Sequence, residues 1–263
     1  MRFLIFISIF LGDLLKIDFA NYRLFVFIEQ TLRNKRSTKF LFSCFLNLKR
    51  NSNKRKSRSF IPYALVPISF YGYNKEKLSV YLTRELAENI RKFIPRRLQL
   101  QEKWKLVYSL DHHGSSLLTL YLKSSQNRGV FSSRPGFVLV VKDSNNNIFG
   151  AFINEYFHPS TSYYGSRECF VWKVVSNDSL DDINGVACRF KAFMPTGIND
   201  FMILCDNSFL SIGGGDGKYG LWIDGQLEKG ISTSTQTFNN DPLSDSVRPG
   251  QRFDIIGVEV WKI

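Results

Sequence analysis

A glycine-dense segment constrains the fold of this chain more than any other feature of its sequence. Residues 213–220 read Gly-Gly-Gly-Asp-Gly-Lys-Tyr-Gly. They contain a formal GxGxxG pattern at Gly215, Gly217 and Gly220. A dinucleotide site needs a helix after the third glycine, so that its first N–H groups meet the pyrophosphate. Here the apolar, β-prone residues 221–223 follow, and Asp224-Gly225 is a hairpin signal that turns the chain back toward Leu227. We therefore predict a strand after Gly220 and no bound cofactor.

The basic charge of the chain is concentrated at its N-terminal end. The formal net charge is +12, and residues 1–60 hold 13 Lys and Arg against only three acids. The rest of the chain is close to neutral. Nucleic-acid binding requires Lys and Arg gathered on the folded domain itself. We therefore expect no nucleic-acid partner. The 44% hydrophobic content is sufficient for a substantial core.

The first 60 residues differ in composition from the remainder. No uninterrupted apolar run reaches the ~18 to 20 residues that a transmembrane helix needs, so we expect no transmembrane span. The acid-poor sequence from Arg33 to Ser59 favours an organelle-import or membrane-surface leader and, equally, a disordered basic arm. We predict three parts: this leader or arm at 1–60, a lead-in segment with a helix at 61–96, and a folded domain at 97–263.

Two helices are predicted in the middle of the chain. Thr83 is a candidate N-cap, and Pro95 ends the helix that follows it. A second helix is predicted over 115–123, with Ser115 or Gly114 as its cap. Its expected buried set is Leu117, Leu118, Tyr121 and Leu122.

After Pro135 the apolar period changes to that of strands. Residues 137–141 and 148–153 form a predicted hairpin around a turn rich in Asp and Asn. Further strands are predicted at 170–175, 201–205, 210–212, 221–223 and 253–262. Strands that are apolar on both sides need cover on both sheet faces, so the predicted class is α+β, a sandwich of sheets with helices packed outside.

Six segments in this order resemble the TLDc domain, as found in the fungal oxidation resistance protein family. They are residues 104–109, 113–117, 141–143 with 149–152, 165–170, 209–217 and 259–261. The resemblance implies that 97–263 is a TLDc domain, folded as a two-sheet antiparallel β-sandwich with helices around it. It also implies protection from oxidative damage by a protein that is not an enzyme. Subunits of the vacuolar-type proton-pumping ATPase are the implied partner. The implied location is the mitochondrion, with the cytoplasm or the vacuolar membrane surface as alternatives.

The resemblance implies no catalytic, cofactor-binding or metal-binding residues. It marks a set of motif residues as structural or interaction residues: His113, Gly114, Gly150, Glu168, Gly214, Gly215, Gly217, Gly220, Glu259 and Trp261. We expect a rigid domain that presents the loops 156–167 and 233–248 to a protein partner.

Two catalytic hypotheses stand beside this interpretation. The first is a hydrolase built on His113, Ser115 and either Glu168 or Glu259, although groups so near in sequence rarely converge as a triad. Strand alternation instead places Glu259 on one face with Phe253, Ile255, Gly257 and Trp261. A buried carboxylate there needs an Arg or backbone N–H groups as partners.

The second hypothesis is a peroxide-scavenging thiol protein that uses Cys169, Cys188 and Cys205. The spacing of the four cysteines, which include Cys44, supports neither a zinc site nor a redox dithiol. Such a scavenger needs an exposed thiol of low pKa, whereas we expect Cys169 and Cys205 to be buried in strands. Three histidines, two of them adjacent, favour no metal site.

Overall fold

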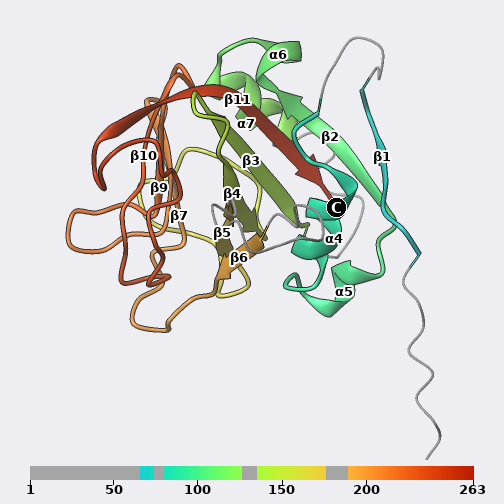
Figure 1. Ribbon diagram of the computed structural model, residues 1–263, viewed down its shortest axis with the longest axis horizontal. Helices are drawn as coiled ribbons and strands as arrows, with labels where there is room; N and C mark the ends of the chain where they lie inside the picture. The colour runs from blue at the N-terminus through green and yellow to red at the C-terminus, as the bar shows by residue number, and fades with distance from the viewer. Residues whose placement is uncertain (1–65, 74–79, 126–134, 176–188) are drawn as a thin grey trace, which may run out of the picture. The chain divides into compact units, whose positions relative to one another are not determined.

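The computed structural model describes residues 66–73, 80–125, 135–175 and 189–263, all within one compact unit, Ala64–Ile263. The unit is mostly antiparallel β-sheet with a few short helices (Figure 1). Among the described residues, every helix is too short or too polar to cross a bilayer. The predicted leader at 1–60, with Cys44, and also Cys188 lie outside the described residues.

Eleven strands form one continuous hydrogen-bonded sheet in the described part of the chain. They are β1 (Ser69–Tyr71), β2 (Lys103–Ser109), β3 (Phe137–Asp143), β4 (Ile148–Ile153), β5 (Phe170–Val175), β6 (Arg189–Phe193), β7 (Ile203–Cys205), β8 (Phe209–Ile212), β9 (Leu221–Asp224), β10 (Lys229–Ile231) and β11 (Arg252–Lys262). Nine of them follow one another in the order β6-β5-β4-β3-β11-β10-β9-β8-β7, and off this path β2 pairs with β11 and β1 pairs with β2. Only β1 and β2 pair in parallel among the described strands. Every apolar run predicted as a strand is confirmed, and β9 follows Gly220 as predicted.

The long strand β11 connects two groups of strands, β1 to β6 and β7 to β10, which we call the two wings of the sheet. Its first residues, Arg252–Asp254, pair with β10. From Ile255 onward it pairs with β3, and its last residues, Glu259–Lys262, also pair with β2. Figure 1 shows β11 in red, running from the wing of β7 to β10 toward β2. The two wings are therefore joined through β11, which pairs with β10 at its start and with β3 and β2 further on.

The helices are α4 (Arg84–Arg91), α5 (Arg96–Gln99), α6 (Leu110–His113) and α7 (Leu117–Ser125). The prediction for α4 is confirmed, because the Thr83 hydroxyl accepts a hydrogen bond from the Leu86 N–H at 3.2 Å. This bond satisfies one of the free N–H groups of the first turn. The helix ends before Pro95.

The prediction for α7 is wrong in its cap and in half of its buried set. Ser116 caps the helix, since its hydroxyl accepts a hydrogen bond from the Thr119 N–H at 3.2 Å. Ser115 is exposed. The buried stripe is Leu117, Leu120, Tyr121 and Ser124, while Leu118 and Leu122 are 62% and 59% exposed. Both stripes follow the i, i+4 spacing of a helix, and only tertiary packing decides between them.

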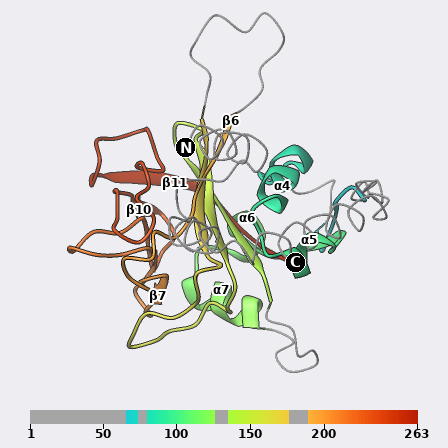
Figure 2. The ribbon, with the colours of Figure 1, turned by 90° about the horizontal axis from the view of Figure 1, so that it is seen from below.

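Two apolar clusters cover the opposite faces of the sheet that contains β3. In β3, Phe137, Leu139 and Val141 belong to the cluster shared with the β7 to β10 wing and α7. The alternate residues Val138 and Val140 belong to the cluster shared with α4. Figure 2 shows α4 on one side of this sheet and β7 and β10 on the other. Alternate residues of β3 therefore point to opposite faces, and each face is covered by one cluster, which confirms the predicted cover on both faces.

The predicted alternation along β11 is wrong for Phe253 and Ile255. Glu259 and Trp261 are both fully buried and share a face, as expected. Phe253 and Ile255 instead belong to the cluster on the opposite face. Register irregularities between Ile255 and Gly257 and after Val260 shift the pattern, because a bulge adds a residue to one strand.

Candidate functional site

The carboxylate of Glu259 is buried and bonded only to N–H groups. It accepts hydrogen bonds from the backbone N–H groups of Tyr81 at 2.7 Å and Leu82 at 3.2 Å. The indole N–H of Trp261 donates a third bond at 2.8 Å. Burial raises the pKa of Glu259, although these hydrogen bonds oppose the shift. Glu259 thus joins the segment that precedes α4 to the last strand.

Three of the four groups of the hydrolase hypothesis are engaged elsewhere, and the fourth, Ser115, is exposed. The Nδ1 atom of His113 accepts a hydrogen bond from the Ser109 N–H at 3.1 Å, so this nitrogen carries no proton. Glu168 forms a bidentate pair with Arg97 at 2.5 and 2.6 Å and accepts a bond from Asn154. Within the described part of the chain, no hydrogen bond or ion pair joins His113, Ser115, Glu168 and Glu259 to one another. The structure does not bring them together as a triad.

Both described thiols are buried and hard to ionise. Cys169 and Cys205 are fully buried, and loss of hydration raises the pKa of each thiol to about 11. The Cys169 thiol donates a hydrogen bond to Asn154, and Cys205 accepts one from the Tyr164 hydroxyl at 3.1 Å. Since the thiolate is the reactive form, neither has the exposure or the low pKa of a peroxide scavenger.

The glycine-dense segment is the loop between β8 and β9. Gly213, Gly215 and Gly217 have φ values of +75°, +119° and +69°, which side chains rarely adopt. Gly214 is needed for space, because a Cβ atom there would lie 2.5 Å from the Tyr163 hydroxyl. The backbone N–H of Gly214 donates a hydrogen bond to the Thr237 hydroxyl at 2.9 Å. The segment therefore meets two other loops, at Tyr163 and at Thr237.

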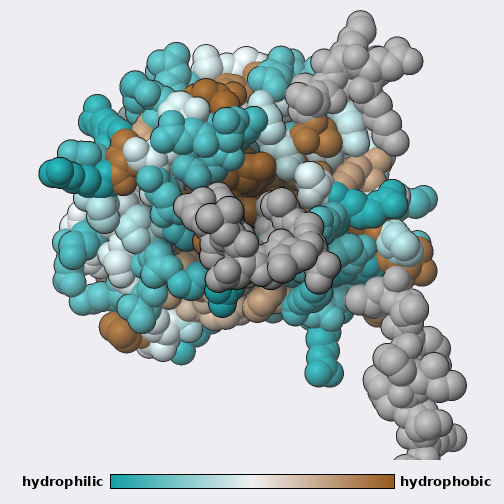
Figure 3. All heavy atoms as spheres, in the orientation of Figure 1, coloured by the Kyte–Doolittle hydropathy of each residue, from teal (hydrophilic) through white to brown (hydrophobic). Residues whose placement is uncertain are grey.

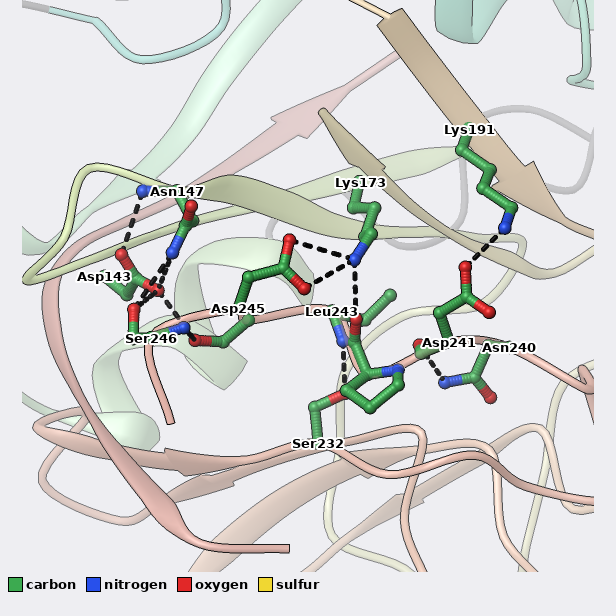
Figure 4. A network of polar contacts seen from close by, with 12 residues as sticks. Asp143, Asn147, Lys173, Lys191, Ser232, Asn240, Asp241, Leu243, Asp245 and Ser246 are labelled. Atoms are coloured by element: carbon green, nitrogen blue, oxygen red, sulfur yellow. Dashed lines mark hydrogen bonds and ion pairs between the residues drawn. The ribbon is translucent and has the colours of Figure 1, made fainter. Parts of the chain in front are cut away.

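The loop 232–248 is fastened to the sheet by two ion pairs (Figure 4). The ammonium group of Lys173 on β5, almost completely buried, binds both carboxylate oxygens of Asp245 at 2.8 and 3.1 Å. On the neighbouring strand β6, Lys191 pairs with Asp241. Lys173 and Lys191 are direct cross-strand partners, so two like charges side by side each have an acid of their own.

Asp143, at the end of β3, fixes the far end of the same loop. Its carboxylate accepts hydrogen bonds from the Ser244 hydroxyl at 2.7 Å and from the Ser246 hydroxyl. Asn147 adds bonds from its side chain and its backbone N–H. Burial opposes ionisation of this carboxyl, but the hydrogen bonds outweigh it and hold the pKa of Asp143 below its ordinary value.

Together these contacts define one continuous loop surface. We use this term for residues 156–167, 194–201, 213–220 and 232–248. Thr196 connects the second segment to the fourth, through its backbone N–H to the Thr237 carbonyl at 2.8 Å. A hollow of about 440 Å³ lies between Ile198, Gly215 and Gln236. Because the segments bond to one another and to the sheet, the loop surface is held in one conformation.

Three large apolar side chains are exposed on the loop surface. Met194 is 43% exposed, Ile198 70% and Phe201 41%. The ring of Phe201 stacks on that of Tyr163, with 4.6 Å between the ring centres. Seven other large apolar side chains are exposed elsewhere in the described residues, among them Leu118 and Leu122 on α7. The face drawn in Figure 3 is mainly hydrophilic, with small separate apolar patches. These three residues come from one segment, 194–201, and exposed apolar residues that form a patch are typical of protein interaction sites.

The expected site residues are spread over several places in the fold. Gly214, Gly215, Gly217 and Gly220 belong to the loop between β8 and β9, whereas Trp261 lies in the cluster shared with α4 and its indole binds Glu259. Gly150 lies between strands, where a Cβ atom would come 1.9 Å from the Leu139 carbonyl oxygen. Gly114 adopts a φ of +77° after α6. In the described residues, no three His, Cys, Asp or Glu side chains are grouped as metal ligands.

The sequence interpretation missed the residues that hold the loop 232–248. A signal was present, because Lys173 interrupts the apolar run of β5 at a position that faces the loop. A lysine in a buried strand needs an acidic partner nearby.

Comparison with known proteins gives consistent matches. The family model of the TLDc domain matches residues 75–263. Oxidation resistance protein 1 of Yarrowia lipolytica is 42% identical over 200 residues, which cover 76% of this chain and 80% of that protein. The protein of the same name from Saccharomyces cerevisiae is 39% identical, with coverage of 76% and 79%. The one from Podospora anserina is 40% identical, and the match spans 65% of its length.

Proposed function

This chain belongs to the TLDc domain family, and on that premise we propose that it protects cells from oxidative damage by binding another protein rather than by catalysis. The similar fungal proteins carry the name oxidation resistance protein 1. The observation that carries the proposal is the loop surface, which is held rigid and exposes Met194, Ile198 and Phe201. A rigid surface favours binding, because little conformational entropy is lost when the partner docks.

We propose the vacuolar-type proton-pumping ATPase as the partner and a two-sheet β-sandwich as the scaffold. Residues of both wings share one apolar cluster, which supports a sandwich whose two sheets are joined through β11. Such a scaffold has a packed interior, so its loops are the parts free to make contacts. The hydrogen bonds and ion pair that engage His113, Glu168 and Glu259, together with the two buried thiols, favour binding over catalysis in the described residues.

The test replaces two exposed apolar residues of the loop surface, Met194→Glu with Ile198→Glu. The matched control is Leu118→Glu with Leu122→Glu on α7, where both leucines are also exposed. Each variant is expressed in a fungal strain that lacks its native copy. Peroxide survival and copurification of the ATPase subunits are then measured. We expect the loop variant to lose both and the control to keep both. Equal behaviour of the two variants, or survival without any copurified ATPase, would contradict the proposal.

We further propose that residues 1–60 direct the chain to the mitochondrion. Their 13 basic and three acidic residues have the composition of an import leader. Fluorescent fusions of the full chain and of a chain that starts at Phe60 test this. If the two fusions distribute alike, the leader has no such role.

A further inference from the structure

A cavity of about 330 Å³ is lined by basic side chains, and none of its lining residues belongs to the loop surface. Four elements contribute them: Lys105 from β2, His112 and His113 from α6, Lys123 from α7 and Lys262 from β11. Tyr71, Gly72, Leu106 and Val107 complete the lining. No acidic side chain is among these lining residues.

Two of the lysines face each other across paired strands. Lys105 and Lys262 are direct partners in the antiparallel register of β2 and β11. Like charges in this arrangement repel each other and destabilise the sheet. The same arrangement recurs between Lys173 and Lys191, where Asp245 and Asp241 neutralise the two charges. The pair in the cavity has no such acids among the described residues.

The charges of the cavity remain uncompensated in the part of the chain that the structure describes. Lys105, Lys123 and Lys262 are half-buried, and none of them is in an ion pair there. Lys262 lies over the ring of Tyr156, 5.7 Å from its centre. Burial and Lys105 lower the pKa of Lys262, and burial, Lys123 and His112 lower that of His113. Burial and the neighbouring positive charges therefore make Lys262 and His113 harder to protonate.

We propose that this cavity binds a ligand that carries at least two phosphate groups. Three ammonium groups from three different elements surround a space that a small polyanion fills. A single carboxylate would leave two of the lysines unpaired. Phosphate oxygens accept hydrogen bonds from Lys and His, and such charge-assisted bonds are about twice as strong as neutral ones. His113 adds its Nε2–H as a donor, because its Nδ1 accepts the hydrogen bond from Ser109.

The phosphate groups belong either to a free polyphosphate or to a lipid headgroup, and the experiment separates the two sources. Titration calorimetry of the full chain with pyrophosphate and tripolyphosphate measures the free form. Flotation with phosphatidylcholine vesicles, with and without phosphatidylinositol bisphosphate, measures the lipid form. Both experiments are repeated with the double variant Lys105→Gln with Lys262→Gln. The control is Lys92→Gln/Lys218→Gln, which removes the same charge from two exposed lysines outside the cavity. Circular dichroism checks that each variant is folded.

We expect the natural chain and the control to bind at least one probe and the cavity variant to bind it about tenfold more weakly, a loss equivalent to ~1.4 kcal/mol. Binding of the inorganic probes identifies a free ligand, and binding to the phosphoinositide vesicles alone identifies a lipid headgroup. If the natural chain binds no probe, or if both double variants weaken binding equally, the proposal is overturned. These outcomes are independent of ATPase copurification, so this inference and the proposed function can fail separately.

Discussion

The indole N–H of Trp261 donates a hydrogen bond to the carboxylate of Glu259, two residues earlier on β11, at 2.8 Å. The same carboxylate binds the backbone of Tyr81 and Leu82, more than 170 residues away along the chain. One fully buried acid, without a basic partner among its hydrogen bonds, therefore fixes the entry to α4 against the final strand.

We expect Glu259→Ala to lower the free energy of unfolding by about 3 kcal/mol, because three buried N–H groups lose their acceptor. Urea unfolding at neutral pH measures this change. The control Glu228→Ala removes an exposed acid and is expected to change stability by less than about 0.5 kcal/mol. Equal unfolding midpoints for the two variants would show that Glu259 is not an anchor.

The ion pair of Lys173 and Asp245 is expected to respond asymmetrically to mutation. Asp245→Ala leaves a buried ammonium group whose remaining hydrogen bond in the described residues is to the Pro242 carbonyl, at 3.0 Å, and is expected to cost about 3 kcal/mol. Lys173→Met leaves a carboxylate that is 59% exposed and is expected to cost about 1 kcal/mol. Thermal unfolding of both variants and of the double variant measures the difference. A reversed order would contradict burial of the lysine.

Asp143 is expected to contribute stability that depends on pH. Its pKa in the folded chain is held below the reference value of 3.8, so the unfolded chain binds more protons at acidic pH. The contribution is then fully present above pH 3.8 and is lost as the pH falls through the folded value. Comparison of the natural chain with Asp143→Asn should show a difference of about 2 kcal/mol at pH 7. That difference should shrink below pH 3.8; a difference that is constant with pH would contradict ionisation of Asp143.

The buried thiols are expected to resist modification in the folded chain. With a pKa of about 11, about one thiol in a thousand of Cys169 or Cys205 is ionised at pH 8. In a variant with Cys44→Ser and Cys188→Ser, a thiol-specific chromogenic disulfide should react slowly before denaturant is added and with two thiols afterwards. Fast reaction of the native variant would reopen the scavenger hypothesis.

Local chemistry was enough to predict the regular elements. Thr83 and Pro95 mark the two ends of the segment that holds α4, and the apolar runs mark the central strands. The strand after Gly220 followed from residues 221–223 alone. These signals lie within a few residues of the structure that they specify, so a single sequence contains them.

Features that depend on distant partners were not predicted. β2 and β6 mix charged and apolar residues, and only their neighbours β11 and β5 give them a place in the sheet. The bulges of β11 change which side chains face each cluster, and Gly257, at the first of them, is only a weak local signal. The contacts of Lys173 and Asp143 with the loop 232–248 join residues about 70 to 100 positions apart. Only the folded chain brings such pairs together.

The shared strand β11 also has a consequence for the order of folding during translation. Every other described strand precedes it in the sequence, yet β2, β3 and β10 each leave an edge unpaired until it arrives. A ribosome that extends the chain from the N-terminus therefore produces a nascent domain with several open sheet edges. Such edges invite pairing with other chains, so the interval before β11 emerges is when this protein most needs a chaperone.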